Sequence, residues 1–203
     1  RRSSDLKKSG YFQSQAGEWD SNGQVLWLLD RFEQLSRSKL DPELIPAIVS
    51  AVTWIQNKRL PGSGESLHAG LLPAGFSAEH LGPNDYYYWD DLWAAAGLQH
   101  AAHILQRHDR SQEANRATQA GNDFMRTIWN SIGAIPEKRT AGGIPASPYR
   151  RLDAGAVGSL VADYPLHITP AGDTQIMHTV EFLIRNCFHQ GGFFQDMIHS
   201  GIN

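Results

Sequence analysis

The chain has 203 residues and 41% of them are hydrophobic, so it can bury a substantial core as one large domain or two small ones. Charged residues make up 19% and the net charge is -3, which argues against a polybasic surface for nucleic acid or an anionic membrane. No apolar run reaches the roughly 18 residues of a membrane-spanning helix.

The first part of the chain predicts a helical hairpin. Residues 1–16 are polar and basic at first and are interpreted as an irregular segment. Apolar residues then recur at helical spacing, which predicts a helix over about 22–37. In the turn that follows, Asp41 suits a helix N-cap and Pro42 suits the first helical position, and a second helix runs to about Lys58. Helices joined by so short a turn lie antiparallel.

A long loop and a second hairpin follow. The stretch 60–83 is rich in Gly, Pro, Ser and His, which is typical of a loop, and loops of this length in a compact domain are usually functional. The next helix is expected over about 90–107 and its partner over about 111–131. Another irregular run, 133–152, carries glycines and prolines and separates this hairpin from the next.

The last part of the chain predicts a third, shorter hairpin. Asp153 is placed to cap a short helix that residues 153–160 open, and a partner helix is expected over about 173–188. The tail, 191–197, is interpreted as another loop. We therefore expect residues 1–203 to form a single all-α domain in which long loop, helix, short turn and helix repeat about three times. The long loops then gather on one face, where the helix N-termini favour aspartates.

Two of these helix starts combine aromatic rings with carboxylates. The first helix begins directly after Trp19 and Asp20. The helix of the second hairpin begins in an aromatic run that leads into Asp90 and Asp91. The aromatic residues of that run are Tyr86, Tyr87, Tyr88 and Trp89. Aromatic faces beside paired carboxylates suit a site that stacks sugar rings and holds their hydroxyl groups, so we predict a carbohydrate pocket built from helix N-termini.

Several of these residues also have a purely structural interpretation. Trp19 and Asp20 are expected to form a sugar platform and a hydroxyl ligand, with a core Trp and a capping Asp as the alternative. Consecutive tyrosines face different ways, so some of the aromatic run must line a surface or cleft. In the tail, Asp196 and His199 are predicted to reach the same pocket, with helix capping as the alternative for the histidine.

Three histidines, His100, His103 and His108, lie at helical spacing along the predicted second hairpin. A zinc site needs more ligands in a suitable geometry, so we expect surface or core histidines and no metal site. The single cysteine, Cys187, excludes an internal disulfide and is expected to be a small buried side chain. Nothing in the sequence calls for a nucleotide or another cofactor.

The hairpin rhythm and three short stretches resemble the six-hairpin glycosidases. The stretches are GEWDSNGQ (17–24), DYYYWDDLW (85–93) and GGFFQDMIHSGIN (191–203). The nearest relatives suggested are glucoamylase, trehalase and glycogen-debranching enzymes. The resemblance covers most of residues 17–203 and implies an (α/α) toroid in which inner-helix N-termini line a sugar pocket. Six hairpins need more chain than this, so we expect a partial toroid or part of a longer protein. In the resembled families one of the two catalytic carboxylates often comes from a late hairpin, and we expect that carboxylate to lie outside this chain.

The resemblance implies an inverting glycoside hydrolase that acts on an α-linked glucan or a small glucoside through carboxylate acid/base catalysis. In glucoamylase-like enzymes a glutamate follows an Asp-Leu-Trp stretch, but here Asp91-Leu92-Trp93 is followed by two alanines. Asp90 or Asp91 is therefore expected to act as the acid or to bind sugar hydroxyls. Neighbouring residues on a helix point about 100° apart, so we expect one aspartate to work in the pocket and the other to be a structural cap. The alternative is that both cap the helix.

The main alternative function is a non-catalytic helical module that binds carbohydrate or a protein partner. The hydrolase hypothesis predicts that Asp20, one of the tandem aspartates and Asp196 line one concave face with several aromatic rings. The module hypothesis predicts carboxylates bonded to backbone N–H groups, without a cleft. A toroidal lyase is less favoured because no Arg/Lys cluster accompanies the tyrosines. We expect a carbohydrate substrate, neither nucleic acid nor membrane as partner, and by default a cytoplasmic location; the oligomeric state stays open.

Overall fold

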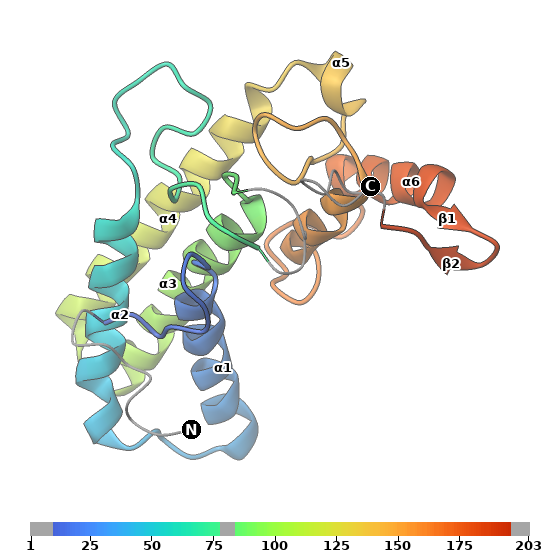
Figure 1. Cartoon of the computed structure of the whole chain (residues 1–203). Coiled ribbons are helices and arrows are strands. Elements are labelled where there is room, and N and C mark those ends of the chain that lie inside the picture. Colours follow the sequence, from blue (N-terminus) through green and yellow to red (C-terminus); the bar gives the residue numbers. More distant parts are fainter. Residues whose placement is uncertain (1–9, 78–83, 196–203) are drawn as a thin grey trace.

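The computed structural model describes residues 10–77 and 84–195 and confirms an all-α fold (Figure 1). None of the helices in the described part of the chain is both long and apolar enough to cross a membrane. The helices and the two short strands are, in chain order, α1 (Ser21–Ser36), η2 (Pro42–Leu44), α2 (Ile45–Lys58), α3 (Tyr88–Arg107), α4 (Ser111–Gly133), α5 (Glu137–Thr140), η3 (Ala154–Ala162), α6 (Thr174–Cys187), β1 (Phe188–His189) and β2 (Gly192–Phe193).

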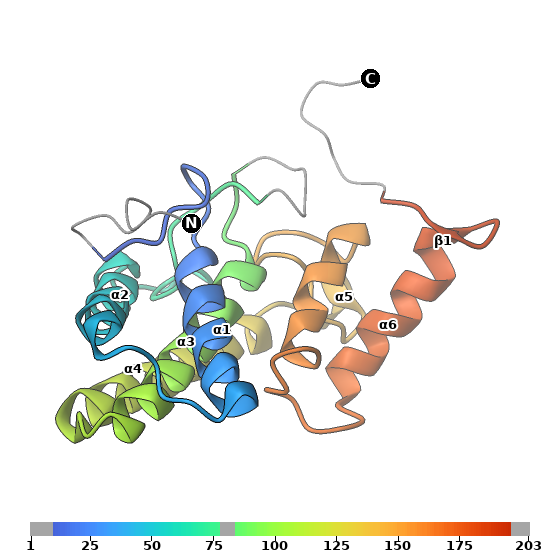
Figure 2. The same cartoon turned by 90° about the horizontal axis from the view of Figure 1, so that it is seen from below.

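Helices α1 and α3 lie side by side and run in the same direction (Figures 1 and 2). Asp20 bonds to Trp89 at their N-terminal ends, and Glu33 bonds to Arg107 near their C-terminal ends. The first helices of the two hairpins are therefore parallel, and their N-termini meet at the same end of the molecule. This arrangement brings Trp89, which precedes Asp90 and Asp91, next to Asp20.

Two glycines let α1 and α3 approach each other closely. A Cβ added to Gly97 would lie 2.5 Å from the Cα of Gly23, and a Cβ added to Gly23 would overlap the carbonyl group of Trp93. The backbones of the two helices are thus in contact, with no side chain between them. Glycine occupies both positions at which the two helices cross, and a larger residue at either position would force the helix backbones apart.

The second helix of each hairpin packs on the outside of this pair. Helix α4 lies along α3, and α2 contacts both α3 and α4. Arg59, at the end of α2, joins them through an ion pair with Asp123 at 3.0 Å and a hydrogen bond to Thr127 at 3.1 Å. The first two predicted hairpins are confirmed, with their short turns at one end of the molecule and the long loops at the other (Figure 1).

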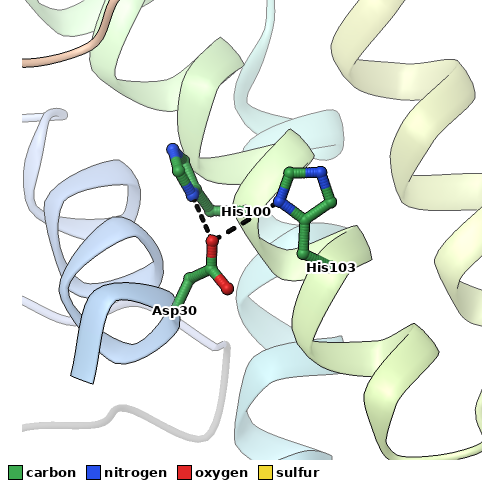
Figure 3. A group of neighbouring side chains, drawn as sticks. All are labelled: Asp30, His100 and His103. Atoms are coloured by element: carbon green, nitrogen blue, oxygen red, sulfur yellow. Dashed lines mark hydrogen bonds and ion pairs between the residues drawn. The ribbon is translucent and has the colours of Figure 1, made fainter. Parts of the chain in front are cut away.

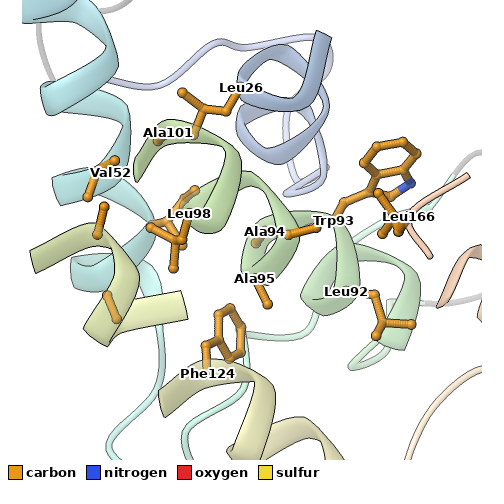
Figure 4. Close-up of a cluster of buried hydrophobic side chains, with 14 of the residues drawn as sticks. Leu26, Val52, Leu92, Trp93, Ala94, Ala95, Leu98, Ala101, Phe124 and Leu166 are labelled. Atoms are coloured by element: carbon orange, nitrogen blue, oxygen red, sulfur yellow. The ribbon is translucent and has the colours of Figure 1, made fainter. Parts of the chain in front are cut away.

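The core lies around α3, which is covered on several sides. Leu26 of α1, Val52 of α2, Leu98 of α3 and Phe124 of α4 are buried in one hydrophobic cluster (Figure 4). Many of the other core positions of α3 are alanines, which keep the neighbouring helices close. They are Ala94, Ala95, Ala96, Ala101 and Ala102. A small-residue helix in the centre therefore accounts for the dense packing of the first two hairpins.

The third hairpin differs from the prediction in its first helix. Residues Ala154–Ala162 form a 3-10 helix, η3, rather than an α-helix. Its sequence, AGAVGSLVA, holds two glycines, which weaken α-helix formation. The predicted cap is confirmed, because the Asp153 carboxylate accepts from the amide of Gly155 at 2.8 Å. Helix α6 packs against η3, and η3 packs against α3 (Figure 2). The short α5 and the β1–β2 ribbon were not predicted.

The long loop after α2 is tied to the helices along its first half. The guanidinium group of Arg59 donates to the carbonyl of Gly70 at 2.8 Å, and the hydroxyl of Ser131 donates to the carbonyl of Leu67 at 2.5 Å. The amide of Leu72 donates to a carboxylate of α3 at 2.8 Å. The loop therefore contacts α2, α3 and α4, and it lies close to the predicted site.

Candidate functional site

The N-termini of α1 and α3 bring the two predicted segments together. The indole N–H of Trp89 donates to the Asp20 carboxylate at 2.8 Å, which links residues 69 positions apart. We call this surface the N-terminal face and define it by Trp19, Asp20, Trp89 and Asp90. This hydrogen bond brings one indole ring and one carboxylate from separate hairpins together.

Trp19 is half-buried at this face. Its indole N–H donates to the carbonyl of Pro73 at 3.0 Å, and the ammonium group of Lys58 lies 3.7 Å from the centre of its ring. Burial lowers the pKa of Lys58, and the ring beneath it provides a cation–π contact. One side of the Trp19 ring is therefore covered by a cation that belongs to the protein.

Asp20 precedes α1 but does not cap it. The residue sits at the N-cap position, yet its side chain makes no capping hydrogen bond to the helix backbone. One oxygen of the buried carboxylate instead accepts from Gln24 at 2.8 Å and from Trp89 at 2.8 Å. The Asp20 side chain is therefore not a helix cap. It connects the start of α1 to Trp89 at the start of α3.

The aromatic run divides into buried and half-exposed rings. Tyr87 and Tyr88 are buried, and the hydroxyl groups of Tyr88 and Ser131 lie 2.7 Å apart. Burial raises the pKa of Tyr88 well above its usual range. Tyr86 and Trp89 are half-buried and reach the surface. Tyr88 is therefore a core residue, whereas Tyr86 and Trp89 keep ring surface that a ligand can contact.

Tyr86 belongs to an aromatic group that the sequence did not reveal. Its ring stacks on His68 with a centroid distance of 4.2 Å and an interplanar angle of 3°. The Nδ1 atom of His68 lies 2.6 Å from the hydroxyl of Tyr149, which comes from the loop before η3. Two loops, the one between α2 and α3 and the one before η3, therefore contribute rings to one cluster, and only tertiary folding brings them together.

Asp90 lies close to both helix starts. It is buried in the first turn of α3. Burial raises the pKa of both Tyr11 and Tyr87 to about 12, and the negative charge of Asp90 adds to the rise in each case. Asp20 adds to the rise for Tyr11 as well, so Asp90 and Asp20 act on the same phenol. Asp90 also follows Trp89, whose indole N–H donates to Asp20, so both carboxylates belong to the region where α1 and α3 begin.

Asp91 has a different environment from Asp90. It is fully buried, and its Oδ1 accepts from the amide of Leu72 at 2.8 Å, which anchors the long loop to α3. Burial raises the pKa of Asp91 to about 8, although this hydrogen bond and the nearby charge of Arg59 oppose the rise. The N-cap of α3 is Tyr87, so neither aspartate is the N-cap residue. Asp91 is the structural member of the pair, holding the loop instead of the helix end.

We expect the Asp91→Asn substitution to remove a pH dependence of stability. The folded-state pKa of about 8 lies above the ordinary value of 3.8. The stability that the neutral carboxyl contributes is therefore full below about pH 4 and is lost as the pH rises through about 8. The amide keeps the acceptor for Leu72 and cannot ionise, so the variant is expected to be on the order of 2 kcal/mol more stable than the wild type at about pH 9. Urea unfolding at about pH 5 and about pH 9 measures this. The prediction is contradicted if the free energy of unfolding changes equally between the two pH values in the wild type and the variant.

The segment before η3 adds polar groups that sequence reasoning missed. The hydroxyl of Ser147 donates to Asp85 at 2.7 Å, next to the tyrosine run. The positive charge of Arg150 opposes the rise in the pKa of Tyr87, and Arg150 also forms an ion pair with Asp153 at 2.7 Å. The sequence shows no cation next to the tyrosines, but the fold brings Arg150 to them. Asp196 and His199, which were predicted to complete the pocket, lie outside the described residues.

A second polar cluster lies further along α1 and α3 (Figure 3). We call it the Asp30–Glu33 network. Its acidic members, Asp30 and Glu33, are buried on α1. Its basic members come from α3 and the residue after it, and they are His100, His103, Arg107 and His108. The three histidines predicted to be ordinary surface or core residues thus face carboxylates of the neighbouring helix.

The carboxylates of this network stay ionised although they are buried. Burial alone raises their pKa values, but hydrogen bonds from His100 and Arg107 hold the pKa of Asp30 well below its usual range. The amide of Leu40, followed by His108 and Arg107, likewise lowers the pKa of Glu33. The sequence does contain the charges of this network, because Asp30 and Glu33 are three positions apart on α1 and the basic residues that they contact lie along α3 and directly after it. This pairing becomes readable only when the two helices are known to be parallel.

Two cavities lie outside the predicted site. A cavity of about 790 Å³ opens between the two short turns, next to Lys39, Pro42 and Arg110. A cavity of about 310 Å³ lies between the end of α4 and the loop before α6, next to Trp129 and Asp173. Neither is lined by a residue of the N-terminal face.

Comparison with protein-family models, with curated proteins and with solved structures finds no match for this chain.

Proposed function

We propose that the N-terminal face binds carbohydrate and that the protein is a glycoside hydrolase acting on an α-linked glucan or a small glucoside. The observation that carries this proposal is the hydrogen bond between Trp89 and Asp20, which joins an indole ring and a carboxylate from separate hairpins. The half-buried rings of Trp19, Tyr86 and Trp89 supply flat apolar surface for sugar rings, with polar groups beside it. Ionised carboxylate oxygens accept hydrogen bonds from hydroxyl groups, which is the recognition that a sugar needs.

Within this proposal the tandem aspartates have separate roles. Asp90 is the acid or the hydroxyl ligand, because it stands in the first turn of α3 directly after Trp89, which donates to Asp20. Asp91 holds the long loop through Leu72 and does not contact the substrate. Inverting hydrolysis needs a second carboxylate to activate water, at roughly 6.5–9.5 Å from the acid. Asp196, predicted above as a sugar-binding residue, lies outside the described residues, and this proposal assigns no residue as the base.

We further propose that these hairpins belong to an (α/α) toroid of the six-hairpin type. The parallel arrangement of α1 and α3, with α2 and α4 outside them, supports this proposal. In such a fold the inner-helix N-termini surround the substrate, and the N-terminal face is the corresponding surface here.

Glucose release from a panel of α-glucosides and maltooligosaccharides tests the proposal. We expect the Asp90→Asn substitution to lower kcat by about a hundredfold or more, because the amide cannot transfer a proton to the leaving oxygen. The matched Asp91→Asn variant is expected to keep kcat, since that side chain holds the loop through an oxygen that the amide retains. Equal activity in the wild type and the Asp90→Asn variant removes the acid assignment.

A non-catalytic module that binds carbohydrate is the second candidate. It is favoured by the internal hydrogen bonds of Asp20 and Asp91, and by the position of both cavities away from the N-terminal face. Calorimetric titration with the same oligosaccharides separates the two functions. Binding that is lost in a Trp89→Ala variant, without any turnover in the wild type, assigns the module function.

A further inference from the structure

Three side chains in the Asp30–Glu33 network direct ligand atoms toward one point. The Oδ2 atom of Asp30 lies 2.5 Å from the Nδ1 atom of His100 and 3.4 Å from the Nδ1 atom of His103 (Figure 3). All three atoms lie within 4.8 Å of one another. Two imidazole nitrogens and one carboxylate oxygen therefore converge on a single position between α1 and α3.

The helix geometry holds these ligands in place. His100 and His103 are three positions apart, so both rings project from the same side of α3. Asp30 has no exposed surface, and the parallel packing of α1 on α3 brings it below the two rings. The Oδ1 atom of Asp30 is bonded to Arg107, which leaves Oδ2 as the oxygen that faces the histidines. The contact with Arg107 thus orients the Asp30 carboxylate before any ion binds.

We propose that Asp30, His100 and His103 form a binding site for a divalent transition-metal ion such as Zn²⁺. Two imidazoles and one carboxylate are a donor set that these ions take, and the carboxylate neutralises part of the charge. Ligand atoms of a tetrahedral zinc ion with bonds of about 2.0–2.1 Å lie about 3.3 Å apart. The Asp30–His103 separation already has this value, and the Asp30–His100 pair needs to open by less than about 1 Å.

Water supplies the fourth ligand of the proposed metal ion. The His103 side chain is 60% exposed, whereas that of His100 is 13% exposed, so the site opens to water on the His103 side. In the metal-bound site each imidazole is neutral, carries its proton on Nε2 and gives the Nδ1 lone pair to the ion, so the Nδ1 proton that His100 donates to Asp30 in the free protein is released to solvent. The amide of Gln34, which donates to the same Asp30 oxygen at 3.0 Å, has to give way. Arg107 places a positive charge beside the ion, so this site is weaker than a closed structural zinc site.

Calorimetric titration of the full chain, free of any histidine tag, with ZnCl₂ tests the site. We expect one ion per chain and a rise in Tm with ZnCl₂ concentration, because the ion binds the folded state. The His103→Ala variant is expected to lose affinity by about tenfold or more. His103 is exposed and makes the longer contact, so the variant is expected to fold. The matched control is His189→Ala, which removes an exposed histidine from the distant β1 strand and is expected to bind as the wild type does.

Co²⁺ provides a readout of the ligands themselves. Its visible absorption gains intensity when nitrogen ligands hold it in a four-coordinate site, and this signal is expected in the wild type and the His189→Ala variant but not in the His103→Ala variant. The proposal is overturned by the absence of one-to-one ZnCl₂ binding to the wild type. It is equally overturned by unchanged affinity in the His103→Ala variant, which would leave the cluster as an ion-pair network only.

Discussion

Replacing Asp30 with alanine is expected to lower the free energy of unfolding by about 3–5 kcal/mol. The substitution leaves Arg107 and His100 without the buried carboxylate that both contact. A buried ion pair need not be more stable than apolar side chains of the same volume, but removal of Asp30 leaves the mostly buried His100 without its carboxylate and leaves Glu33 as the remaining carboxylate partner of Arg107. Urea denaturation at about pH 7 measures the loss. The control is Glu181→Ala, which breaks an exposed pair with Arg185 and is expected to cost less than about 1 kcal/mol.

The same substitution is expected to change the response to acid. The pKa values of Asp30 and Glu33 are lowered in the folded state, so their contribution to stability is present above the ordinary carboxylate pKa and is lost as the pH falls below about 4. The wild type should therefore lose more stability between about pH 6 and about pH 3 than the Asp30→Ala variant does. A variant as stable as the wild type at neutral pH would mean that solvent already screens the network.

Replacing Gly23 with alanine is expected to lower the free energy of unfolding by about 3 kcal/mol. The new Cβ would overlap the backbone of Trp93, and backbone cannot move aside as a flexible side chain can. The helices α1 and α3 must then separate along their whole contact, which also disturbs the bond between Asp20 and Trp89 at the N-terminal face. Thermal unfolding followed by circular dichroism measures the destabilisation, and a lower sugar affinity is expected alongside it if the N-terminal face binds carbohydrate.

The control for this experiment is Gly133→Ala, the same change near the end of α4. Nothing lies within 4 Å of a Cβ at that position, so we expect no loss and up to about 1 kcal/mol of added stability from the better helix former. Similar behaviour of the two variants would show that the helices α1 and α3 move apart at little cost in free energy, and would contradict the prediction for Gly23.

Much of the fold could be predicted from local sequence. The apolar periodicity of α1, α2, α3 and α4 predicts their positions to within a few residues, and Asp41 and Asp153 cap the segments that follow them, as expected. The prediction failed where local signals were weak. Glycines at 155 and 158 turned the predicted helix into η3, and the four-residue α5 is too short to show a periodic pattern.

The candidate site could be predicted only in part. Helix starts with aromatic and acidic residues were visible in the sequence, and the bond between Trp89 and Asp20 confirms that these starts meet. The division of labour between Asp90 and Asp91 could not be predicted, because it depends on where the loop amide of Leu72 lies. Arg150 was missed for the same reason, since its loop reaches the tyrosines only in the folded chain.

The long loop after α2 has a consequence for how the N-terminal face would meet a ligand. Arg59, Ser131 and Asp91 fix the loop at Gly70, Leu67 and Leu72 through hydrogen bonds to three different helices. The chain loses the freedom of this segment when it folds rather than when it binds. Less conformational entropy is then lost when a ligand binds, so we expect the ligand to meet a preorganised surface and not a loop that closes over it.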